Sequence, residues 1–160
     1  MAAIGSPACV HTLVEHGANL RRRITFTGGG VGVGPWHGIK GEATALHYAV
    51  HDGSPETVKY LLNAGMAPNA TDIYGQTPLH VAIWTERTAR KTKDSVNETQ
   101  IENIKMLLKN DASIWFEDCD GLTAFGIAAK ASSPSQVVSL LEARQQQLTI
   151  AFKSAGRPLE

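Results

Sequence analysis

The sequence predicts an all-α repeat protein in which short helix pairs stack into a solenoid. The first observation is a motif that recurs along the chain: TALHYAV at 44–50, TPLHVAI at 77–83 and TAFGIAA at 123–129. The second is a leucine motif after each copy: VKYLLNAG at 58–65, IKMLLKND at 104–111 and VVSLLEAR at 137–144. The third is spacing, because Thr44 and Thr77 lie 33 residues apart, a period typical of stacked repeats.

Each unit is predicted to contain two helices. In the unit at 44–65 the apolar residues form two stripes at helical spacing, Leu46, Ala49 and Val50, then Val58, Leu61 and Leu62. We expect Gly53 to end the first helix, Ser54 to cap the second and Pro55 to occupy its first position. Gly65 should end that second helix. The Ser-Pro pair recurs at the equivalent places, 6–7 and 133–134, which supports this register.

The units follow one another through a single domain, 1–160, interrupted by two insertions. Leu13 aligns with Leu61, but the connection that follows it is fifteen residues too long, and the third unit exceeds 33 residues by 13. We therefore divide the chain into a half-repeat 1–20, an insertion 21–40, a repeat 41–73, a repeat 74–119 with an insertion 86–98, and a C-terminal capping repeat 120–155. Arg144 replaces the glycine stop, so we expect the last helix to continue through 145–152.

The chain also opens at the end of a first helix, because Ala2 aligns with Val50. A half-repeat leaves an apolar face without its neighbour. We therefore expect either a piece of a longer array or a sequence that lacks its start.

These motifs resemble the ankyrin repeat family. Residues 77–82 match its signature T-P-L-H-x-A in full, and 44–49 depart from it only at Ala45. The segments DIYG at 72–75 and DCDG at 118–121 are similar to the aspartate and glycine of the family's turns. The resemblance implies a right-handed stack with projecting turns, called fingers, and a structural role for His47, which hydrogen-bonds the backbone of a neighbouring turn.

Composition excludes several classes of function. The 15 Lys and Arg residues balance 15 Asp and Glu residues, so the chain has no basic excess for nucleic acid or an acidic membrane. No stretch approaches 18 consecutive apolar residues, and the N-terminus is a poor signal peptide. Two cysteines make no disulfide framework. We expect an intracellular monomer, cytoplasmic or nuclear.

No catalytic, metal or cofactor site is predicted. The glycines at 28–34 lack a following Gly-Lys-Ser/Thr and a helix start, so they indicate an insertion loop and not a phosphate loop. His47 and His51 could form a metal pair, but no third ligand is evident. Cys119 lies between two aspartates that disfavour a thiolate. Arg21–Arg23 could contact an acidic partner, and the cations at 87–93 could form a localisation or polyanion patch. For both stretches the sequence favours a solvated loop over these roles.

The remaining hypothesis is a protein–protein interaction module without chemistry of its own. Its alternative is an intramolecular regulatory domain of a larger enzyme or channel. The resemblance implies binding through finger tips and first-helix ends, which here are Ile73, Tyr74, Gln76, Cys119, Asp120, Leu122, His51, Asp52, Trp84, Thr85 and Lys130. Tyr74 and Trp84 are the expected anchors, although Trp84 could instead pack under the second insertion.

Overall fold

The described parts of the chain form seven α-helices. The computed structural model describes residues 7–20, 22–23, 42–52, 54–89, 96–130 and 135–154. The helices are α1 (Pro7–Glu15), α2 (Ala45–His51), α3 (Pro55–Asn63), α4 (Pro78–Ala89), α5 (Val96–Lys109), α6 (Ala124–Lys130) and α7 (Ser135–Ser154). The predicted all-α class is confirmed.

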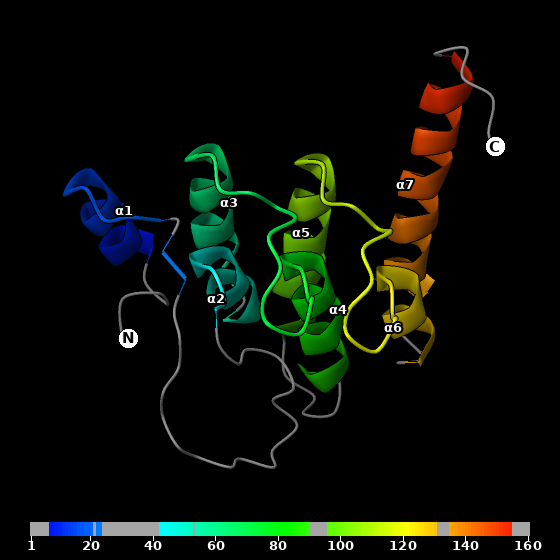
Figure 1. Cartoon of the computed structure of the whole chain (residues 1–160), viewed down its shortest axis with the longest axis horizontal. Coiled ribbons are helices and arrows are strands. Elements are labelled where there is room, and N and C mark those ends of the chain that lie inside the picture. The colour runs from blue at the N-terminus through cyan, green and yellow to red at the C-terminus, as the bar shows by residue number, and fades with distance from the viewer. Residues whose placement is uncertain are drawn as a thin grey trace.

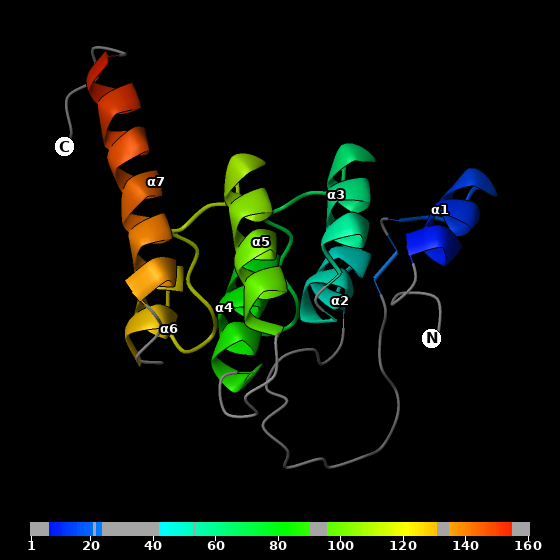
Figure 2. The ribbon, with the colours of Figure 1, turned by 180° about the vertical axis from the view of Figure 1, so that it is seen from behind.

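The helices form two rows that run along an elongated array. Figures 1 and 2 show α2, α4 and α6 in one row and α3, α5 and α7 in the other, with α1 beside α3. Each helix of the first row packs against its partner in the second row and against its neighbours along the row. This arrangement confirms the solenoid, because each unit covers its apolar face with the next one.

The predicted apolar stripes form a continuous core. Leu46, Ala49 and Val50 of α2 and Val58 and Leu61 of α3 are all 0% exposed. The later units supply the next part of the core, including Leu79, Ile83, Ile104, Leu107, Ile127 and Leu141. Burying each large apolar side chain contributes about 1.5–3 kcal/mol. The helical spacing in the sequence is therefore the main determinant of the stack.

The ends of α3 agree only in part with the sequence-based prediction. Pro55 is the first residue of the helix and Ser54 precedes it, but the Ser54 hydroxyl caps no backbone N–H. It donates instead to Oγ1 of the buried Thr57 at 2.8 Å, so the predicted side-chain cap is wrong. Gly53, Ser6, Ser133 and Pro134 lie outside the described residues.

Gly65 ends α3 as predicted. It adopts a left-handed φ of +82°, and its N–H donates to the Leu62 carbonyl at 3.0 Å. The N–H of Met66 then donates to the Leu61 carbonyl at 3.1 Å, and the Met66 side chain is buried. This pattern satisfies two carbonyls of the last helical turn.

Replacing Gly65 with alanine should lower the free energy of unfolding by about 1–2 kcal/mol, because an L side chain is strained at this φ. A Cβ at position 65 would meet no atom within 4 Å, so the loss reports backbone strain alone. Urea unfolding of the wild type and G65A measures it. Equal midpoints would show that the turn does not require this conformation.

The described parts of the second insertion, 86–89 and 96–98, are helical, which corrects the prediction of a loop at 86–98. Helix α4 has 12 residues where α2 has 7, and α5 has 14 where α3 has 9. The insertion therefore extends both helices, and residues 90–95 lie outside the described part. The added residues, ERTA at 86–89 and VNETQ at 96–100, form no apolar stripe at helical spacing, which is why periodicity did not reveal these extensions.

Little of the first insertion is described. Residues 24–40, with the glycines at 28–34, lie outside the described part. Arg23 is described, and its Nη1 donates to Oε2 of Glu42 at 3.3 Å and to the Thr71 carbonyl at 3.0 Å. Its guanidinium thus binds groups of its own chain.

Helix α7 continues past the position of the missing glycine, as expected. It has 20 residues and ends at Ser154. Arg144 lies on it, and Nη2 of Arg144 donates to Oδ1 of Asp111 at 2.7 Å. The residue that replaces the glycine therefore ties α7 to the turn after α5. None of the described helices is both long and apolar enough to cross a bilayer.

Candidate functional site

Two fingers with the same hydrogen bonds project from the array, finger A (residues 72–77) and finger B (residues 118–123). In finger A, Oδ1 of Asp72 accepts the N–H groups of Tyr74 and Gln76 at 2.8 and 2.9 Å. In finger B, Oδ1 of Asp118 accepts the N–H groups of Asp120 and Leu122 at 3.0 and 2.9 Å. The glycines at 75 and 121 have φ values of +71° and +70°. The predicted turn roles of these aspartates and glycines are confirmed.

The fingers also contact each other. The N–H of Cys119 donates to the carbonyl of Tyr74 at 2.8 Å, and the Cys119 thiol lies 3.8 Å from the carbonyl of Ile73. A Cβ on Gly75 would lie 3.4 Å from Cα of Asp118. Backbone contacts therefore fix the spacing of the two fingers before any partner binds.

Buried histidines join each first-row helix to the following finger. Nε2–H of His47 donates to the carbonyl of Gln76 at 3.0 Å, and Nδ1 accepts the N–H of Thr44 at 3.2 Å. Nε2–H of His80 is shared between the carbonyls of Phe116 and Leu122, both at 3.1 Å. The structural role that the resemblance implied for His47 is confirmed.

These bonds use the ring nitrogens of His47, so it offers no free nitrogen for a metal pair with His51. Among the described residues, no three His, Cys, Asp or Glu side chains gather where a metal ion could be held.

Burial lowers the pKa of both His47 and His80 below the ordinary value of 6.5. The bonds to the finger carbonyls and the nearby carboxylates of Asp72 and Asp118 oppose this shift in pKa without reversing it. Both rings are therefore neutral in the folded protein at neutral pH.

Acid should destabilise the domain through these two rings. Because their pKa values are lower in the folded state, the unfolded chain binds more protons as the pH falls below 6.5. The free energy of unfolding should be constant above that pH and should decrease below it. Urea midpoints from pH 8 to pH 5 measure this dependence. A double variant, His47→Gln with His80→Gln, should show a flatter profile, and an unchanged slope would assign the effect to other groups.

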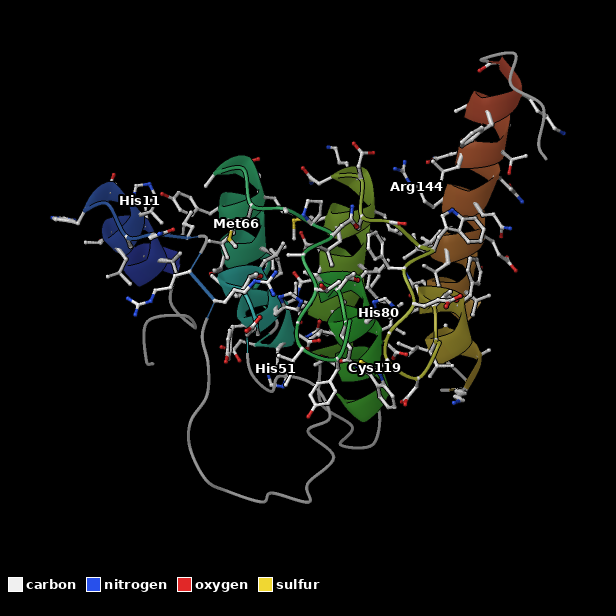
Figure 3. All side chains as sticks on the ribbon, in the orientation of Figure 1. His11, His51, Met66, His80, Cys119 and Arg144 are labelled. Carbon is white, nitrogen blue, oxygen red and sulfur yellow. The ribbon has the colours of Figure 1, made fainter. Side chains whose placement is uncertain are left out.

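A groove of about 480 Å³ lies between the fingers, the middle of α4 and the C-terminal end of α6, so Trp84 does not lie at a helix end as expected. Its lining residues come from four elements: Tyr74 and Gln76 of finger A, Asp118, Cys119, Asp120 and Leu122 of finger B, Trp84 of α4 and Lys130 of α6. Seven of these eight residues belong to the set of eleven selected from the sequence. Figure 3 shows Cys119 at the lower edge of finger B, on the side of the array where His51 also lies.

The other four predicted residues lie outside this lining. Ile73 is 51% exposed in finger A. Nδ1 of His51 lies 3.3 Å from Oδ1 of Asp52, at the end of α2. The hydroxyl of Thr85 donates to the carbonyl of Val81 within α4 at 2.7 Å. These four residues do not line the groove.

Two of the residues predicted to bind a partner are less exposed than an open binding surface requires. Gln76 is only 6% exposed, because its backbone is held between Asp72 and His47 at the base of finger A. Trp84 is half-buried and packs against the hydrophobic core, so it forms a wall of the groove. As an expected anchor, Trp84 is therefore only partly available to a partner, since one side of it packs on the core. The side chains at 86–97 lie outside the described part, so packing under the insertion stays a prediction.

Sequence reasoning missed three notable residues. Asp118 was assigned only to the turn, although its place in the DCD sequence put it beside two selected positions. Trp115 and Phe116, before finger B, are 55% and 42% exposed. They occupy the positions of Asn69 and Ala70, and this change from small or polar to aromatic was the available signal.

Stacked helix pairs joined by paired fingers define a helical repeat protein. The family described as "Ankyrin repeats (3 copies)" matches residues 1–91. The chain belongs to the ankyrin repeat family.

The chain is similar in sequence to parts of three longer proteins. It is 40% identical over 81 residues to the E3 ubiquitin-protein ligase KEG of Arabidopsis thaliana and 36% identical over 78 residues to a putative ankyrin repeat protein of Rickettsia bellii. It is 28% identical over 116 residues to the B-cell lymphoma 3 protein homolog of Mus musculus. The matches cover 51%, 49% and 72% of this chain but only 4%, 28% and 24% of those relatives. Ankyrin repeats are generally protein-interaction modules and typically non-catalytic.

Proposed function

We propose that this chain is a protein-binding module whose groove receives a segment of an intracellular partner. The observation that carries this proposal is the convergence of Tyr74, Trp84 and Leu122 with polar residues in one groove. In this proposal residues 1–160 act as one monomeric domain, and residues 120–155 form its C-terminal cap. The domain requires no nucleic acid, metal or cofactor.

The composition of the groove fits protein recognition. Tyr74 is 38% exposed, and Trp84 and Leu122 are half-buried against the core. Large aromatic anchors beside a polar rim supply most of the free energy in many protein interfaces. The hydrogen bonds within and between the fingers order the site in advance, so binding loses little conformational entropy.

A second function is favoured by one comparison. The matched segment occupies 4% of the ligase KEG, so a similar set of repeats is a small part of a much larger enzyme there. The groove of this chain would then hold another segment of its own protein and regulate a domain outside 1–160. Expression of the domain together with the rest of its gene product distinguishes the two functions, because an internal ligand would compete with any external partner.

Replacing Tyr74 with alanine should weaken binding by about 1–3 kcal/mol without changing the fold, because Tyr74 is exposed at the groove. The partner would be captured from a cell extract and purified, and its affinity measured by calorimetry. Phe152→Ala is the matched control, since Phe152 is 49% exposed on α7 and outside the groove. Unchanged binding by Y74A, or an equal loss in F152A, would remove the groove from recognition.

A further inference from the structure

One residue of the groove lining has a buried hydrogen-bond acceptor that no donor in the described part of the chain occupies. Gln76 lines the groove and is only 6% exposed, yet Oε1 of its side chain has no hydrogen-bond partner in the described part of the chain. A buried carbonyl without a donor costs free energy. A ligand with an N–H group in the groove would remove that cost.

Two carboxylates of finger B share the lining. Asp118 uses Oδ1 to hold the finger, while Asp120 is exposed and has no ion-pair partner among the described residues. Lys130, at the last residue of α6, is the cation of the lining. Two carboxylates against one ammonium leave the groove with a formal charge of −1, which favours a cationic ligand.

The aromatic walls suit a flat cation. Tyr74 and Trp84 line the same groove as the carboxylates, and the face of an aromatic ring attracts a cation placed over it. A guanidinium group is planar, stacks on aromatic faces and presents five N–H donors. A lysine ammonium is compact, strongly hydrated and cannot stack in this way.

We propose that the groove binds an arginine side chain displayed by an extended segment of the partner protein. The guanidinium stacks beside Tyr74 and Trp84, donates to Oε1 of Gln76 and faces Asp120. This inference rests on the proposed function and adds the chemistry of the ligand. It also assigns Lys130 an opposing role, because the ammonium repels the ligand and lowers its affinity.

The test uses defined peptides, acetyl-Gly-Gly-X-Gly-Gly-amide with arginine, lysine, leucine or glutamate at X. Each is titrated into ¹⁵N-labelled domain, and the signals of the Trp84 indole and the Cys119 amide are followed. A single anchoring side chain should bind with a Kd of about 1–10 mM. The arginine peptide should bind several-fold more tightly than the lysine peptide, and the glutamate peptide should give no saturable shift.

Variants assign the chemistry to single groups. Asp120→Asn and Gln76→Met should each weaken the arginine peptide by about fivefold or more, while Lys130→Met should strengthen it. Gln76→Met keeps the side-chain length and removes the acceptor, so thermal melting should show an intact fold. Glu142→Gln is the control, because Glu142 is an exposed carboxylate on α7, outside the groove. It should bind like the wild type.

Three results would overturn the proposal. The first is no saturable shift with the arginine peptide, and the second is a preference for the glutamate peptide whose affinity decreases in K130M. The third is binding of the leucine peptide with an affinity that D120N leaves unchanged. None of them contradicts the proposed function as long as Y74A still loses affinity for the captured protein. Conversely, if Y74A binds that protein normally, the proposed function fails whatever the peptides do.

Discussion

Replacing Leu61 with alanine is expected to lower the free energy of unfolding by about 2–5 kcal/mol. Leu61 is 0% exposed in α3, between α2 and the neighbouring helices of the second row, α1 and α5. The substitution removes apolar surface and leaves a cavity that helices on several sides would have to close. Urea unfolding followed by circular dichroism measures the loss.

Leu13→Ala is the matched control for this prediction. Leu13 occupies the equivalent position of the leucine motif in α1, yet it is 50% exposed. The same truncation should therefore cost less than about 1 kcal/mol. Comparable losses at Leu13 and Leu61 would show that α1 is packed as tightly as α3, against the half-repeat interpretation. Tyr74→Ala should show the reverse pattern to L61A, with binding lost and stability kept.

Sequence reasoning predicted the parts of the fold that repeat. The spacing of Leu46, Val50, Val58 and Leu61 follows the helical period, and burial of one face fixes the packing of each pair. Asp72 and Asp118 recur, each with a glycine three residues later, because the finger hydrogen bonds need a short acceptor at that place. Where a residue has one local structural role, the sequence alone is sufficient to predict that role.

The remaining features depend on contacts that periodicity does not encode. The extensions of α4 and α5 have charged residues and no repeat of their own. Gln76 and Tyr74 lie two residues apart in finger A. Gln76 is buried at the base of the finger, where His47 and Asp72 bind its backbone, and Tyr74 is exposed. The groove forms where two fingers meet the middle of α4 and the end of α6. The sequence therefore predicted most of its residues but not that they lie together.

Two buried amides on α5 depart from the apolar pattern of the core. Gln100 and Asn103 are both 0% exposed, and none of their side-chain nitrogen or oxygen atoms has a hydrogen-bond partner in the part of the chain that the structure describes. The equivalent residues of α3 are Ser54 and Thr57, whose hydroxyls bond each other at 2.8 Å. The third unit therefore has longer polar side chains at positions where the second unit has a self-satisfied pair.

Replacing these amides with apolar side chains of similar size should stabilise the domain. Each unpaired buried amide costs about 1–3 kcal/mol, so Gln100→Met with Asn103→Leu should raise the free energy of unfolding by about 2–5 kcal/mol. Gln136→Leu is the control, because Gln136 aligns with Asn103 on α7 but is exposed and hydrated, and it should gain nothing. Urea unfolding of all three proteins compares them. A loss of stability in the double variant would mean that the amides hold an internal water or another polar group, since only satisfied amides are costly to remove.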